Sequence, residues 1–148
     1  MTNAAKDKGD RAERHFVDHV APWWPNARRG KAGGEADLGD IFNISDRHGD
    51  DWTVQVADRD IMARQHGKVI AKAREAAQQS ERAGTPMWCL VVKRAGCGPT
   101  MVGDWFVWLP VWAVVDTNGD GMWTRAAEDD LVCLTVRTWV AMFAPEAF

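Results

Sequence analysis

Residues in the first half of the chain combine side-chain types that could hold a divalent metal ion. Asp40 opens a β-type run, Gln55 and Ala57 lie on the run expected to face it, and Glu13 belongs to an N-terminal helical segment. Strand side chains alternate between faces, so Gln55 and Ala57 are expected to point the same way. Carboxylate and amide oxygens suit Mg²⁺, which takes one or two carboxylates and keeps several waters. Such an ion can polarise a phosphodiester and generate the attacking hydroxide.

Each of these residues also has a purely structural explanation. Asp40 could cap the turn that leads into a strand, since Asp is common in turns. Glu13 could be a solvated acid near the start of a helix, where the helix dipole favours it. Gln55 could satisfy a neighbouring backbone group. Their combination, rather than any one of them, indicates a site.

The hydrophobic pattern predicts the elements that would position these residues. The expected elements are a helix at about 10–20, strands at 40–44 and 52–57, a long helix of about twenty residues ending at 83, and strands at 87–92 and 105–109. The run at 87–92 is apolar throughout, as expected for a strand covered on both faces. This order predicts an α/β or α+β fold with a mixed β-sheet flanked by helices.

The length of 148 residues indicates a single domain, with a core at about 8–115 and a C-terminal strand and helix extension at 116–148. The extension could pack on the core, form a dimer interface or cover the site. Asp116–Asp129 imitates a calcium-binding loop, but its twelfth position is Ala127 instead of glutamate. A tight hairpin with an Asn-Gly turn is the preferred interpretation.

Composition excludes some partners. No apolar run approaches the roughly 18 residues of a membrane span, and the charged first twenty residues favour a cytoplasmic protein. The net charge of −3 does not favour nucleic acid overall. A local positive loop, with Arg28, Arg29 and Lys31, is either solvated or placed to meet phosphates.

The order of the candidate residues resembles a known superfamily. Glu13, Gly39-Asp40-Ile41, Gln55-Val56-Ala57, a long helix and a strand ending "VVKR" are similar to the PD-(D/E)XK nucleases over about 8–115. Within them the chain resembles Holliday junction resolvase-like endonucleases of phages and actinobacteria. The resemblance implies a restriction-endonuclease-like core and a Mg²⁺- or Mn²⁺-dependent DNA endonuclease, selective for branched DNA, in a bacterial or phage-infected cell. Two symmetric cuts in a four-way junction imply a two-fold homodimer.

The resemblance also implies roles by position. Asp40 would be the metal-binding aspartate, Gln55 would stand at the second acidic position, and the carbonyl of Val56 would be a further ligand. Glu13 would touch the metal through water. Lys93 would join the positive loop in contacting DNA.

Position 57 departs from this pattern, because the superfamily places a lysine there and Ala57 has neither a proton nor a charge to offer. Alanine could have replaced lysine to trap an inactive enzyme, or cleavage could have been lost while binding was kept. Otherwise another basic residue took over, and the candidates are Lys93, Arg59 and Lys72. Losing such a group typically removes about 10²–10⁴-fold in rate.

Two alternatives to a working nuclease remain open. The first is a catalytically inactive nuclease-fold module that binds DNA or protein. The second is an interaction module built on exposed tryptophans, such as Trp23 and Trp24, although core or dimer contacts are the more common role of such pairs.

Overall fold

The computed structural model describes residues 4–30, 38–58, 66–115 and 130–145. In this part of the chain six strands form one sheet, and their order across the sheet follows their order in the sequence. The central pair, β3 and β4, is parallel, whereas the other neighbouring strands are antiparallel. The predicted mixed sheet flanked by helices is therefore confirmed.

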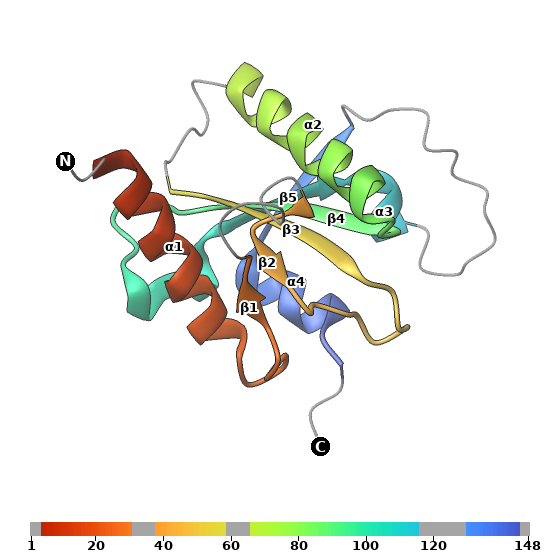
Figure 1. The fold of residues 1–148 in the computed structure, drawn as a ribbon, viewed down its shortest axis with the longest axis horizontal. Coiled ribbons are helices and arrows are strands. Elements are labelled where there is room, and N and C mark those ends of the chain that lie inside the picture. The colour runs from red at the N-terminus through yellow and green to blue at the C-terminus, as the bar shows by residue number, and fades with distance from the viewer. Residues whose placement is uncertain (1–3, 31–37, 59–65, 116–129, 146–148) are drawn as a thin grey trace.

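The bounds of the elements fix which residues reach the sheet. In chain order they are α1 (Ala4–Val20), β1 (Arg28–Arg29), β2 (Ile41–Phe42), β3 (Trp52–Ala57), α2 (His66–Ala83), β4 (Met87–Val92), the 3-10 helix η2 (Pro99–Asp104), β5 (Phe106–Pro110), α3 (Val111–Val115), β6 (Leu131–Thr135) and α4 (Val136–Phe143). Helix α2 covers one face of the sheet, while α1 and α4 lie on the other face (Figure 1).

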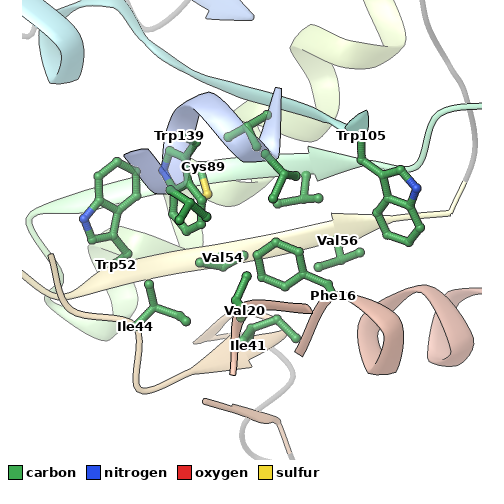
Figure 2. Close-up of a cluster of buried hydrophobic side chains, with 14 of the residues drawn as sticks. Phe16, Val20, Ile41, Ile44, Trp52, Val54, Val56, Cys89, Trp105 and Trp139 are labelled. Carbon is green, nitrogen blue, oxygen red and sulfur yellow. The ribbon is translucent and has the colours of Figure 1, made fainter. Parts of the chain in front are cut away.

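Alternation along β3 divides the hydrophobic core into two parts. Val54 and Val56 face the larger cluster, where they pack with Phe16 of α1 and Trp139 of α4 (Figure 2). Ala57 faces the other way, against the smaller cluster that contains Val69 of α2. The odd positions of β3 therefore point toward α2 and the even positions toward α1, as the period of a strand requires.

The tryptophans belong mainly to the larger cluster. Trp24 and Trp139 have ring centroids 5.2 Å apart, and Trp52 meets Trp139 edge-on at 5.6 Å. Within the described residues no tryptophan is exposed, and Met101 is the one exposed large hydrophobic side chain. An interaction module built on exposed tryptophans therefore has no support in this part of the molecule.

The turn before β3 is held by a buried carboxylate. Asp46 is 5% exposed and accepts hydrogen bonds from the backbone amides of His48 (2.9 Å) and Asp50 (3.1 Å). Its second oxygen accepts the indole N–H of Trp52 at 3.1 Å. The polar turn is thereby tied to the first core residue of β3, which helps to fix where that strand begins.

The C-terminal part of the chain is integrated into the fold. Strand β6 pairs with β5 along five residues, and Val136, Trp139 and Phe143 of α4 are buried in the larger cluster. Residues 130–145 thus pack on the core, which is one of the three roles considered for residues 116–148. The hairpin predicted at 116–129 lies outside the described residues. None of the described helices is long and apolar enough to cross a membrane.

Candidate metal centre

Asp40 enters the sheet just before β2, beside the end of β3. Its backbone amide donates to the carbonyl of Val54 at 2.9 Å, and its carboxylate Oδ2 accepts from the amide of Val56 at 2.8 Å. The preceding Gly39 has φ 120°, and a Cβ there would lie 3.1 Å from Thr53 Cγ2. Glycine is therefore required where the chain turns in toward β3. Asp40 hydrogen-bonds with Val54 and Val56, the residues on both sides of Gln55. The Asp40 and Gln55 side chains therefore start from directly opposite positions, just before β2 and on β3.

The carbonyl of Val56 points toward the same edge. In a strand the N–H and C=O of one residue point to the same neighbour. Since the amide of Val56 donates to Asp40 Oδ2, its carbonyl oxygen is also directed to the Asp40 side. Toward the C-terminal end of β3, no residue of β2 pairs with β3 beyond the Ile41–Val54 pair. This carbonyl is thus placed where an ion bound to Asp40 could use it.

Gln55 supplies the observation that fits a metal most closely. It projects toward the α2 face, and its amide Oε1 is fully buried with no hydrogen-bond partner among the described residues. A buried polar atom left unpaired costs about 1–3 kcal/mol, so native proteins normally satisfy it. An amide oxygen is an acceptor that suits a Mg²⁺ ion or one of its waters. The oxygen donors of Asp40, Gln55 and Val56 are therefore of the kind that binds Mg²⁺.

Burial and charge act together on Asp40. The pKa of this carboxyl is raised to about 6. Desolvation is the largest cause and the nearby charge of Glu13 adds to it, whereas the hydrogen bond from Val56 lowers the pKa. The positive charges of Lys72 and Arg29 lower it. Helix α1, helix α2 and strand β1 therefore each bring a charge close enough to influence the Asp40 carboxylate, as expected where a functional site perturbs a pKa.

Glu13 is held by an arginine. Its Oε2 accepts from Arg29 Nε at 2.9 Å, and Arg29 Nη2 is 2.9 Å from Asp10 Oδ1. Arg29, predicted to contact DNA, is thus engaged by two carboxylates of α1. The fixed position of Glu13 is compatible with a contact to an ion through water, as the resemblance implies. Arg28 lies over the ring of Phe42 at 4.9 Å, and Lys31 is outside the described residues.

Ala57 occupies an apolar position. It packs against Val69, Leu90 and Val92, beneath α2. Each described candidate to replace a lysine there has an acidic partner: Lys93 Nζ lies 3.9 Å from Asp58 Oδ1, and Lys72 Nζ lies 3.3 Å from Glu75 Oε2. The charge of Lys72 also acts on Asp40. Arg59 lies outside the described residues. Lys72 is therefore the described candidate whose charge acts on the Asp40 carboxyl.

The centre is not a dense cluster of charged ligands. Among the described residues no group of three or more His, Cys, Asp or Glu side chains is placed to hold a metal ion. The candidate set instead has Asp40 as its direct carboxylate, with an amide and a backbone carbonyl, and Glu13 in a second layer. Such a set leaves room for water around Mg²⁺, which dehydrates reluctantly.

Sequence reasoning missed a second group of residues. Lys8, Arg11 and His15 of α1 line one cleft together with Lys93 and Arg94. Lys8, Arg11 and His15 are three and four residues apart, a spacing that places them on one face of a helix. Their convergence with the loop after β4 depends on tertiary packing, so the sequence pattern alone did not reveal it.

The chain has no match in any of the three comparisons with known proteins: no family model, curated protein or solved structure matches it. The resemblance to PD-(D/E)XK nucleases therefore depends on the residues themselves and on where the fold places them.

Proposed function

We propose that this chain is a divalent-metal-dependent endodeoxyribonuclease of the PD-(D/E)XK kind, acting on branched DNA. The observation that carries the proposal is the buried amide oxygen of Gln55, which has no hydrogen-bond partner in the described part of the chain. The residues on both sides of Gln55 hydrogen-bond with Asp40. Phosphodiester hydrolysis is the chemistry that this donor set supports best, because a bound Mg²⁺ or Mn²⁺ would polarise the phosphate and activate water.

The protein's own residues have distinct tasks in this proposal. Asp40 must be ionised to hold a cation, and Arg29 and Lys72 favour that state by lowering its pKa. Gln55 and the Val56 carbonyl add neutral oxygens that do not increase the repulsion around Asp40. Glu13, fixed by Arg29, is available to orient water near the centre.

As a catalyst, the proposed centre lacks a cationic side chain at position 57. A lysine there could lie along Val69 with its aliphatic stem and extend its ammonium group beyond the apolar cluster. Ala57 supplies no such group. In this proposal Lys72 is the replacement cation if the natural chain cleaves DNA, because its charge already influences Asp40.

The apolar packing of Ala57 favours one alternative, a nuclease-fold module that binds DNA without cutting it. Ala57 is partly buried against the cluster of Val69, Leu90 and Val92, so its methyl group suits an apolar position. Both functions share the fold and a DNA partner and differ in catalysis. A two-fold homodimer in the cytoplasm belongs to the resolvase proposal, and sedimentation equilibrium would measure the expected dimer.

The test of function compares the natural chain with Ala57→Lys and Lys72→Gln. Linear, flapped and four-way DNA are incubated with each protein and Mg²⁺, with EDTA as the control. Metal-dependent nicking by Ala57→Lys, preferring the four-way substrate, is the expected result. Nicking by the natural chain that disappears in Lys72→Gln would identify Lys72 as the replacement. Tight DNA binding with no cleavage by any protein would favour the binding module.

A further inference from the structure

A basic cleft lies between α1 and the loop that follows β4. It has a volume of about 650 Å³ and is lined by Lys8, Arg11, His15, Asp58, Lys93, Arg94, Ala95, Gly96 and Pro99. Four permanent cations face one described acid, Asp58, in a chain whose net charge is −3. Positive charge is therefore concentrated in this cleft against the overall charge of the chain, which attracts anionic partners.

Helix α1 carries Glu13 and the basic residues of the cleft on different sides. Ala12, Phe16 and Val20 form its buried stripe. At 100° per residue, Glu13 lies on one flank of that stripe, beside Arg29, and Lys8 and His15 lie on the other flank. One helix thus presents an acidic flank to the candidate metal centre and a basic flank to the loop after β4.

The loop after β4 completes the cleft with a shaped turn. Cys97 donates its amide to the carbonyl of Arg94 at 3.1 Å, and Gly96 has φ 77°, which glycine adopts without strain. The guanidinium of Arg94 lies 5.3 Å from the centre of the Phe106 ring. Stacking on a ring orders a guanidinium while leaving its N–H donors at the edge free for a phosphate.

The cleft is close to the candidate centre across the sheet. Lys93 follows β4 directly and donates its backbone amide to the carbonyl of Ala57 at 2.9 Å. Asp40 lies opposite Gln55, whereas Lys93 lies three residues beyond Leu90, the partner of Gln55 in β4. The two positions are therefore separated by two strand spacings across the sheet and three residues along it, about 14 Å in all. A single DNA strand, with one charge per roughly 3.4 Å of helix axis, spans that distance with about four phosphates.

We propose that this cleft binds the phosphate backbone of the DNA strand that continues from the candidate metal centre, with Lys8, Arg11 and Arg94 as phosphate contacts. This inference rests on the proposed function for its DNA partner. An anionic membrane is the less suitable partner, because the cleft is concave and Met101 is the one exposed large hydrophobic side chain among the described residues.

The test measures binding in EDTA, so that cleavage plays no part. The variant Lys8→Gln/Arg11→Gln/Arg94→Gln is compared with the control Arg14→Gln/Lys68→Gln/Arg82→Gln, which removes the same charge from exposed residues outside the cleft. Affinity for labelled linear and four-way DNA is followed by anisotropy over a salt series. Melting temperatures confirm that both variants are folded.

The expected result is a loss on the order of 10²-fold in affinity near 0.1 M salt for the cleft variant. Its slope of log K against log salt should fall by about 2 to 3, as for three lost phosphate contacts. The control should change both quantities much less. The affinity for Mn²⁺, measured by calorimetry, should be the same in the cleft variant as in the natural chain, because the candidate metal ligands are unchanged.

Equal DNA affinity in the cleft and control variants would overturn the inference and leave the nuclease proposal standing. DNA binding through the cleft, with no metal-dependent nicking by Ala57→Lys, would reject the nuclease proposal and keep the inference. Tighter binding to anionic phospholipid vesicles than to DNA, lost in the cleft variant, would replace DNA by a membrane. No DNA binding by the natural chain would overturn the inference outright.

Discussion

The carboxylate of Asp40 accepts a hydrogen bond from the backbone amide of Val56 at 2.8 Å and so closes the open end of the β2–β3 ladder. This contact places a buried carboxylate beside the backbone of Val56, next to Gln55 in β3. The pKa of Asp40 is raised to about 6, chiefly by burial. The ionised carboxylate is therefore destabilised in the folded protein even with Lys72 and Arg29 nearby, and a bound metal ion would relieve this destabilisation.

The first prediction concerns pH and the metal-free protein. Asp40 has a folded-state pKa of about 6 and a reference pKa of 3.8, so the folded protein binds the proton more tightly. Its contribution to stability is complete below about pH 4 and is lost as pH rises through about 6. The free energy of unfolding in EDTA should fall by about 2 to 3 kcal/mol across this window. Urea unfolding at a series of pH values measures it, with Asp40→Asn as the control.

Asp40→Asn should remove this component of the pH profile and make the metal-free protein more stable than the natural chain at pH 8. The asparagine oxygen can still accept the bond from Val56. An unchanged profile in Asp40→Asn would show that another group causes the dependence.

The second prediction concerns Gln55, whose buried Oε1 has no hydrogen-bond partner among the residues that the structure describes. Gln55→Leu should leave the metal-free protein as stable as the natural chain or more stable, by up to about 1 kcal/mol, because an unsatisfied polar atom is removed. Metal binding should weaken in the same variant. Thermal unfolding with and without Mn²⁺ reports both effects.

Gln55→Glu is the matched opposite. A second carboxylate beside Asp40 should raise metal affinity by about tenfold or more and lower metal-free stability at pH 8, through repulsion between like charges. If both variants respond to Mn²⁺ as the natural chain does, Gln55 does not contact the ion.

The third prediction concerns the Glu13–Arg29 ion pair, which joins α1 to β1 at 2.9 Å. Both side chains are partly exposed, 18% and 33%, so a double-mutant cycle with Glu13→Gln and Arg29→Gln should give a coupling of only about 0.5 to 1 kcal/mol. Arg29→Gln should in addition raise the pKa of Asp40, because one of the charges that lower it is lost. Metal affinity at pH 6 should then fall more than at pH 8. Equal losses at both pH values would contradict this coupling.

The fourth prediction concerns the buried carboxylate of Asp46. Asp46→Ala leaves the amides of His48 and Asp50 and the indole of Trp52 without their acceptor. The expected loss is about 2 to 4 kcal/mol, because buried donors are left unpaired. Asp51→Ala is a suitable comparison, since that exposed carboxylate bonds to Ser45. Denaturant unfolding of both variants should show a clearly larger loss for Asp46→Ala.

The sequence predicted the central elements well because their hydrophobic patterns are long and regular. The bounds of β3 and β4 agree with those expected, and α1 extends further toward the N-terminus than its apolar face indicated. Strand β1 was expected to be part of a loop, because two residues between a proline and a glycine are too few to show the hydrophobic alternation of a strand. The short helix α3 was missed for a similar reason: its apolar residues merge with those of β5.

The candidate site was predicted in its residue types but not in its contacts. The hydrogen bond between Asp40 and Val56 depends on the register of β2 against β3, which the polar turn between them does not reveal. Arg29 was expected to be available for phosphates, yet it pairs with two carboxylates that lie in α1. Such pairings follow from how α1 docks on the sheet, which no local pattern in the sequence encodes.

The most direct test of the central claim is a calorimetric titration of the natural chain, Asp40→Asn and Ala57→Lys with Mn²⁺ at pH 8. One ion should bind to the natural chain and also to Ala57→Lys, because position 57 provides no ligand. Asp40→Asn should lose on the order of 10²-fold in affinity or more, since it removes the direct carboxylate. Equal Mn²⁺ binding by the natural chain and Asp40→Asn, or no binding by the natural chain, would contradict a metal centre at the end of β3.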